Sequence, residues 1–145
     1  MYLNELNDAA LSFIHELAMA RPDPSTLIHV PIMGGATAAV AADETAFGDR
    51  SAQFMLSIDG NTYDSAKFDE VRDWVRASIE AAGRLKGAGG AYLNFSGDAG
   101  TDERVLQQQF GGNLDRLRAI KTQYDPDNLF RVNNNIKPVN LAAGV

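Results

Sequence analysis

The chain has 145 residues, of which 45% are hydrophobic, and this is typical of one globular domain with its own core. Its net charge of −6 argues against a basic surface, so we expect neither nucleic acid nor an anionic membrane as a partner. The absence of cysteine excludes disulfides and thiolate metal sites. The sequence shows neither a membrane-spanning apolar run nor a signal peptide at Met1–Glu5, so we expect a cytoplasmic location.

Two long segments have apolar residues at helical spacing. Residues 4–20 are predicted to form an amphipathic helix that ends before Pro22 and Pro24. Residues 65–85 are predicted to form a second helix, with Asp64 or Ser65 as its N-cap. Residues 101–110 and 112–124 indicate two further helices separated by Gly111–Gly112.

Strand-like segments lie between these helices. Residues 26–33 and 36–40 flank Gly34–Gly35, which indicates two strands joined by a glycine turn, or one strand bent at a bulge. Residues 53–59 and 91–95 are predicted as further strands. The fold class is therefore α+β, with an antiparallel sheet of about four strands and helices packed on one face. We expect a domain at residues 1–124 and an irregular tail at 125–145 that packs on the domain or on a partner.

Alternation along the predicted strands sorts their side chains onto two faces. One face is apolar and is predicted to be the core: Ile28, Val30, Ile32, Phe54, Leu56, Ile58, Leu93 and Phe95. The other face carries thioethers and polar groups: His29, Met33, Thr37, Met55, Ser57, Tyr92 and Asn94. This mixture is typical of a small-molecule surface or a subunit interface, and the alternative is a lightly polar face that touches only solvent.

The last third of the chain carries a long motif, Tyr-Asp-Pro-Asp-Asn-Leu-Phe-Arg at 124–131 followed by Val-Asn-Asn-Asn-Ile-Lys-Pro at 132–138. It resembles the C-terminal signature of berberine-bridge-like FAD oxidases. Shorter segments resemble landmarks of the same family in the same order: residues 34–36, 45–47 with Arg50, 91–94 and 116–121.

The resemblance implies a substrate domain whose sheet lies over a flavin that a separate FAD-binding domain holds. That domain is missing from this sequence, so we expect no cofactor on the isolated chain and FAD only with a partner domain. Tyr92 matches a tyrosine that helps take the substrate hydroxyl proton, and Asn94 matches its partner. Asn133 and Asn135 match residues that lie against the flavin domain. The alternatives are an ordinary strand tyrosine and an asparagine-rich turn.

A phenol is a poor base at neutral pH unless a cation or hydrogen-bond donors stabilise its anion. His29 lies on the same predicted face, and Arg50 is a cation in a nearby loop. Together with Met33, Met55, Ser57 and Asn94, these two residues are the candidate substrate contacts. We find no His/Asp/Glu cluster with metal-ligand spacing.

Our first hypothesis is a substrate-domain module, truncated or split from its FAD domain, that is not a self-sufficient oxidase. The alternative is a flavin-independent protein that binds a small hydrophobic oxygenated molecule or catalyses an isomerisation or cyclisation without a cofactor. A third hypothesis is a purely structural dimerisation module. We expect either a homodimer formed through the open sheet face or a complex with an FAD-binding subunit.

Overall fold

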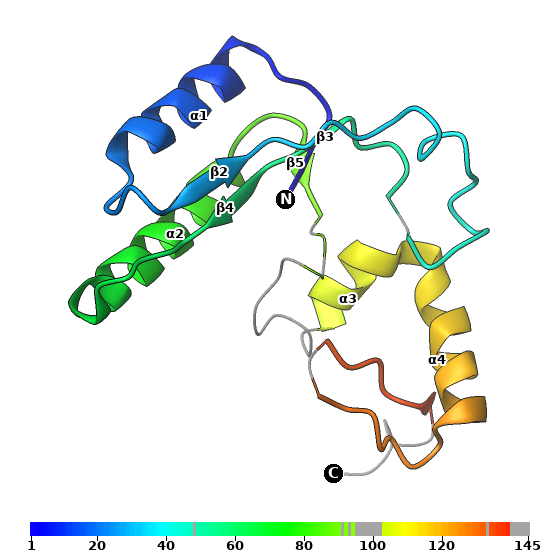
Figure 1. Cartoon of the computed structure of the whole chain (residues 1–145). Helices are drawn as coiled ribbons and strands as arrows, with labels where there is room; N and C mark the ends of the chain where they lie inside the picture. Colours follow the sequence, from blue (N-terminus) through cyan, green and yellow to red (C-terminus); the bar gives the residue numbers. More distant parts are fainter. Residues whose placement is uncertain (48, 91, 93, 95–102, 133, 140–145) are drawn as a thin grey trace. The chain divides into compact units, whose positions relative to one another are not determined.

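The computed structural model describes residues 1–47, 49–90, 92, 94, 103–132 and 134–139. They belong to two compact units (Figure 1). Unit 1 comprises Met1–Gly35 and Ser51–Gly89, and unit 2 comprises Ala36–Arg50 and Gly90–Val145. The predicted division into a domain at 1–124 and a tail at 125–145 stays a prediction. Within the described residues, no helix is both long and apolar enough to cross a membrane.

Two long helices in unit 1 confirm the helical spacing of the sequence. Helix α1, Asp8–Ala20, begins later than predicted because the Asn7 side chain accepts a hydrogen bond from the backbone N–H of Ala10, at 3.0 Å, and so caps the helix. Helix α2, Phe68–Ala82, follows the 3-10 helix η1, Ser65–Lys67. Asp64 caps η1 through a 2.9 Å bond from Ala66 N–H, as predicted.

The strands of unit 1 confirm the α+β class but form two small antiparallel sheets. Strands β1, Tyr2–Leu3, β3, Phe54–Met55, and β5, Ala88–Gly89, pair in the order β3-β1-β5. Strands β2, Leu27–His29, and β4, Ser57–Asp59, pair as a ribbon. Strand β1 was not predicted, because two residues are too short to show alternation.

The predicted strand at 36–40 is wrong, since these residues form turns. Gly34 and Gly35 have φ values of 105° and 55°, which take the backbone out of the extended region. Three of the five residues that follow them are alanine, which is depleted in strands, and only Thr37 and Val40 carry the branched side chains that favour strands. Most of the predicted strand at 91–95 lies outside the described residues.

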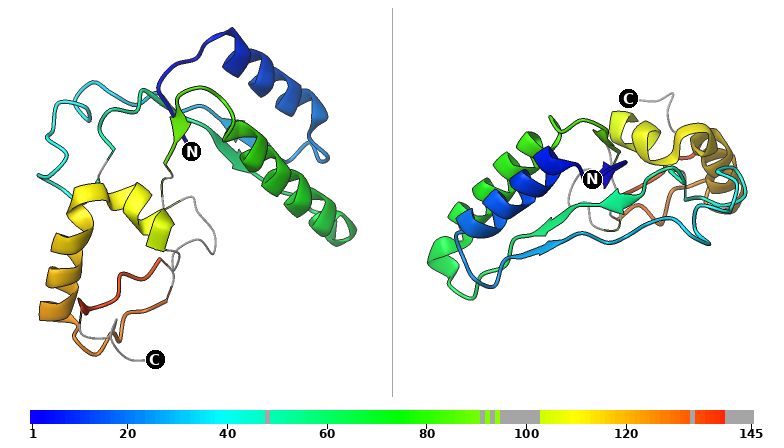
Figure 2. Two further views of the ribbon diagram at one scale, coloured as in Figure 1. Left: turned by 180° about the vertical axis from the view of Figure 1, so that it is seen from behind. Right: turned by 90° about the horizontal axis from the view of Figure 1, so that it is seen from above.

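The core of unit 1 lies between the helices and the strands. Helices α1 and α2 both lie on one side of the β2–β4 ribbon (Figure 2). The buried apolar side chains that form this core are Leu3, Leu17, Leu56, Ile58 and Ala82, with Ile28, Val30 and Phe54 packed against them. The predicted core face is therefore confirmed at these strand positions, whereas Leu93 and Phe95 lie outside the described residues.

Ile32 was wrongly predicted to be a core residue. Its side chain is 82% exposed. The reason is that β2 ends at His29, and Ile32 makes only an isolated bridge to Phe54. The strict alternation assumed from the sequence does not continue past Pro31, which cannot donate a ladder hydrogen bond.

Unit 2 contains helix α3, Glu103–Phe110, the 3-10 helix η4, Gly111–Asn113, and helix α4, Leu114–Tyr124. The predicted break at Gly111–Gly112 is confirmed, and Gly111 has a positive φ of 50°. Leu106 and Leu114 form the centre of a small core, against which Val105, Phe110 and Ile136 pack.

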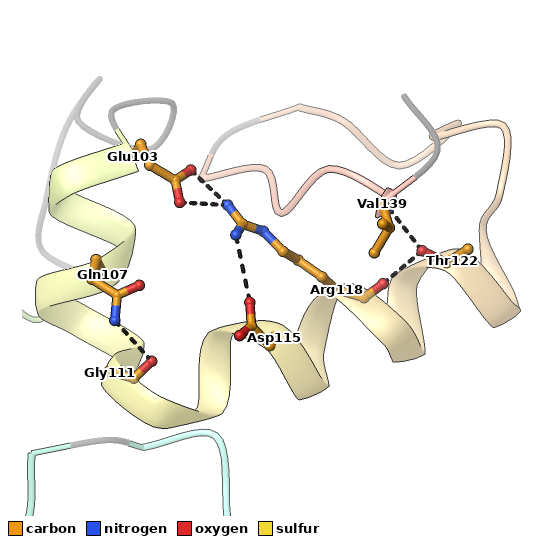
Figure 3. Close-up of polar contacts among 7 residues, drawn as sticks. All are labelled: Glu103, Gln107, Gly111, Asp115, Arg118, Thr122 and Val139. Carbon is orange, nitrogen blue, oxygen red and sulfur yellow. Dashed lines mark hydrogen bonds and ion pairs between the residues drawn. The ribbon is translucent and has the colours of Figure 1, made fainter. Parts of the chain in front are cut away.

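Polar contacts join the two helices and the C-terminal segment of unit 2. Arg118 on α4 donates to both carboxylate oxygens of Glu103 on α3, at 2.7 and 2.6 Å (Figure 3). Thr122 donates to the carbonyl oxygen of Arg118 and accepts from the backbone N–H of Val139, at 2.9 Å. The segment after α4 therefore returns to lie along the same helix.

Candidate functional site

Arg50 is the central cation of the candidate site in unit 2. One guanidinium nitrogen, Nη1, donates to the carbonyl oxygen of Thr37 at 2.9 Å, and Nη2 donates to the hydroxyl of Thr45. The guanidinium carbon lies 4.8 Å from the centre of the Phe47 ring, in cation–π geometry. These contacts fix the Arg50 side chain over the loop that carries it.

Tyr92 also contacts the Phe47 ring. Its ring centre lies 6.0 Å from that of Phe47, and the two rings are inclined at 70°, an edge-to-face arrangement. The side-chain amide of Asn94 donates to the Tyr92 hydroxyl oxygen at 2.8 Å. The structure therefore brings three predicted residues, Arg50, Tyr92 and Asn94, together around Phe47.

This arrangement has one clear chemical consequence. A donor aimed at a phenol oxygen stabilises the oxygen when it carries negative charge. A guanidinium on the neighbouring aromatic ring adds positive charge to the same cluster. The cluster thus places an amide donor on the Tyr92 hydroxyl and a cation on the neighbouring aromatic ring.

The other four predicted substrate contacts lie in unit 1. His29 Nε2 is 3.1 Å from a carboxylate oxygen of Asp59, and the Ser57 hydroxyl donates to the other oxygen at 2.7 Å. Met55 is 5% exposed, and the backbone N–H of Met33 donates to Gln53 at 2.7 Å. Met55 and Ser57 are thus buried rather than on an open face, and the substrate role of all four residues stays a prediction.

The structure describes only one of the two asparagines that are predicted to lie against the flavin domain. Asn133 lies outside the described residues. The side-chain oxygen of Asn135 is buried and has no hydrogen-bond partner in the part of the chain that the structure describes. A buried amide oxygen without a partner is costly, so it marks a place where a missing group can contribute a donor.

Sequence reasoning did not assign a role to Phe47 or Asn113. Phe47 belongs to a segment that resembles a family landmark, but only the structure shows that it links Arg50 to Tyr92. Asn113 donates to the carbonyl oxygens of Ala42 and Thr45, at 2.6 and 3.1 Å. These partners are 71 and 68 residues away in the chain, so no spacing in the sequence could identify them.

Comparison with known proteins identifies the chain. Residues 91–137 match the family model described as berberine and berberine like. The chain belongs to the berberine-bridge-like family of FAD-linked oxidoreductases. It is 31% identical over 141 residues to the uncharacterized FAD-linked oxidoreductase YgaK of Bacillus subtilis (strain 168), covering 92% of this chain and 29% of the relative.

Sugar oxidases are among the other relatives. The berberine-like chain is 30% identical to glucooligosaccharide oxidase of Sarocladium strictum, over 94% of this chain and 29% of the relative. Its fold matches the solved structure of glycopeptide hexose oxidase DBV29 complexed with teicoplanin, with a TM-score of 0.77 at 23% identity, over 94% of this chain and 31% of that one. The chain thus spans about 29% of the length of the curated relatives that it matches first.

Proposed function

We propose that the chain is the substrate-domain module of a flavin oxidoreductase that oxidises a hydroxyl group of a sugar. An FAD-binding domain, in the same polypeptide or in a partner subunit, holds the flavin. The observation that carries this proposal is the contact of Tyr92 with Asn94 and Phe47, beside the cation of Arg50. The much greater length of the FAD-linked relatives supports the need for a second domain.

Tyr92 is the residue proposed to take the proton. When the substrate hydroxyl is oxidised, its proton passes to the Tyr92 oxygen. Asn94 donates to that oxygen at 2.8 Å, and a donor of this kind favours the anionic form of a phenol, which is the form that can accept a proton. The flavin, when bound, supplies the hydride acceptor. The role of this chain is to hold the sugar, to orient its hydroxyl group and to accept the proton.

The proposed substrate class is an oligosaccharide or a sugar attached to a larger molecule. The sequence predicted a small hydrophobic oxygenated molecule, but the relatives act, by their names, on glucooligosaccharides and chitooligosaccharides. A sugar ring has apolar C–H faces and a rim of hydroxyl groups. Phe47 and Tyr92 offer aromatic surface to such faces, and Asn94 and Arg50 offer hydrogen-bond donors.

The residues proposed to contact the flavin are Asn133 and Asn135. The unpaired buried oxygen of Asn135 fits this role, since a donor from outside the described residues would satisfy it. We assign the pyrophosphate and ribose contacts to the FAD-binding domain.

A chimera tests the proposed function. The matching part of the Sarocladium glucooligosaccharide oxidase is replaced by this chain, and hydrogen peroxide release is measured with a glucooligosaccharide. We expect FAD incorporation and turnover, and Tyr92→Phe should retain the flavin but lower kcat by about 100-fold or more, the usual contribution of a general base. A flavin-loaded chimera in which Tyr92→Phe turns over at the parent rate would refute the role of Tyr92.

A homodimer remains a second prediction about partners. Because Met55 is 5% exposed and Ile32 is 82% exposed, Ile32→Glu probes the surface of unit 1, whereas Met55→Glu would place a charge inside it. Light scattering of the wild type should give a dimer, and Ile32→Glu should shift it toward monomer. None of the relatives named above supports the flavin-independent alternative.

A further inference from the structure

The loop that carries Phe47 and Arg50 is held in place by side chains far away in the sequence. Residues 36–47 contain turns and bends but neither a strand nor a helix, and residues 41–46 are all exposed. An exposed loop with few buried apolar contacts opens at low cost in free energy. The geometry of Phe47 and Arg50 therefore depends on whatever anchors this segment.

Asn113, the last residue of η4, provides the main anchor. Its Nδ2 donates to the carbonyl oxygens of Ala42 and Thr45, at 2.6 and 3.1 Å. Asn113 is itself buried, and the next residue, Leu114, is 1% exposed in the small core of unit 2. The anchor therefore lies beside the small buried core of its own unit, and packing there restricts the movement of its side chain.

Arg116, one turn further on, adds a second attachment. Its Nη1 donates to the carbonyl oxygen of Asp43 at 3.1 Å. The two side chains together satisfy carbonyl oxygens at positions 42, 43 and 45 of the loop. Thr45 connects Asn113 to the candidate site. Its carbonyl oxygen accepts a hydrogen bond from Asn113, and its hydroxyl oxygen accepts one from Arg50.

We propose that Asn113 is a positioning residue for the Tyr92 cluster, with Arg116 as its weaker partner. The inference rests on the proposed role of Tyr92. Contacts run from Asn113 to Thr45, from Thr45 to Arg50, from Arg50 to Phe47 and from Phe47 to Tyr92. Loss of the first contact frees the loop and moves the Phe47 ring away from Tyr92.

The side-chain amide is required because both loop partners are carbonyl acceptors. Asn113→Asp has nearly the same shape but presents only acceptor oxygens once ionised, so it repels the carbonyls that the amide held. Thr122→Val is the matched control. It removes the hydrogen bonds of Thr122 to Arg118 on α4 and to Val139 in the C-terminal segment, and it leaves the contacts of Asn113 and Arg116 with the loop intact.

The test is a ¹³C spectrum of the ring positions of tyrosine in the isolated chain, where Tyr2, Tyr63, Tyr92 and Tyr124 are the only tyrosines. The signal that is lost in Tyr92→Phe is that of Tyr92. Phe47→Leu then gives the chemical shift of Tyr92 when the edge-to-face contact with the Phe47 ring is absent. Asn113→Asp should move the Tyr92 signal by more than half of the Phe47→Leu displacement. Thr122→Val should leave it at the wild-type position.

A folded Asn113→Asp variant with an unmoved Tyr92 signal would overturn the inference. If that variant does not fold, Arg116→Ala is used in its place, because it removes only an exposed side chain. We expect it to displace the Tyr92 signal less, and in the same direction. An unmoved Tyr92 signal in a folded Arg116→Ala variant would overturn the inference. The spectrum needs neither flavin nor substrate. An inactive chimera with the expected displacement would therefore count against the proposed function and not against the anchor.

Discussion

Lys121 and Asp125, one helical turn apart at the end of α4, form an ion pair at the base of the loop that follows this helix. The Asp125 carboxylate also accepts from the backbone N–H groups of Leu129 and Phe130, at 2.7 and 3.0 Å. Lys121 donates in turn to the carbonyl oxygen of Phe130 at 2.7 Å. The hydrogen bond from Lys121 is the main cause that lowers the pKa of Asp125 below its ordinary value.

The lowered pKa makes a prediction about pH. A carboxyl group whose pKa is lower in the folded state adds stability above its unfolded pKa, and this stability is lost as pH falls through the folded pKa. Asp125→Asn should therefore unfold at lower urea concentration than the wild type at pH 7, and the difference should shrink as pH falls below about 4. Asp127→Asn, an exposed change in the same turn, is the control and should behave like the wild type at both pH values.

Gly60 should be intolerant of a side chain. A Cβ atom at this position would lie 2.7 Å from Val75 Cγ2 and 2.9 Å from Val71 Cγ1, on two branched residues of α2 that have little rotamer freedom. Gly60→Ala should lower the free energy of unfolding by about 1–3 kcal/mol, the usual cost of overpacking. Gly89→Ala, with no heavy atom within 4 Å of the added Cβ, should be close to neutral in the same urea titration.

Tyr92→Phe should leave the fold intact. The hydroxyl accepts a hydrogen bond from the exposed side chain of Asn94, so its loss should change the free energy of unfolding by less than about 0.5 kcal/mol. Thermal unfolding followed by circular dichroism checks this. A fall of several kcal/mol would instead show that the hydroxyl makes a buried structural bond and would remove the basis for a role in proton transfer.

The isolated chain should be colourless. The relatives that bind FAD are much longer, and we assign the pyrophosphate and ribose contacts to sequence that this chain does not match. A purified sample should show no flavin absorbance band, and a titration with FAD should show weak binding or none. A band that corresponds to one FAD per chain would contradict the proposed division of labour between the two domains.

The helices and the family were predictable because they depend on local or contiguous signals. The spacing of Phe13, Ile14 and Leu17 marks one face of α1, and the motif at 124–138 is long enough to identify a family by itself. Strand pairing was less predictable. Tyr2 pairs with both Met55 and Gly89, and a two-residue strand carries no pattern that names its neighbours.

The candidate site was predicted only in part, for a similar reason. Resemblance to the family selected Tyr92, Asn94 and Arg50, which do lie in one cluster. The sorting into two faces also grouped His29 and Met55 with Tyr92, but these residues belong to a different unit. Alternation indicates the side of a strand on which a residue lies, and it cannot show that two strands belong to the same sheet.

The two units alternate along the chain: residues 36–50, which belong to unit 2, interrupt unit 1. Strand β1 at the start of the chain cannot complete its sheet until β5, at residues 88–89, has been synthesised. Unit 2 likewise cannot fold completely until its second segment, which begins at Gly90, has been synthesised. No continuous fragment therefore contains one whole unit alone, and a single proteolytic cut within 36–50 breaks the chain inside unit 2 and also between the two pieces of unit 1.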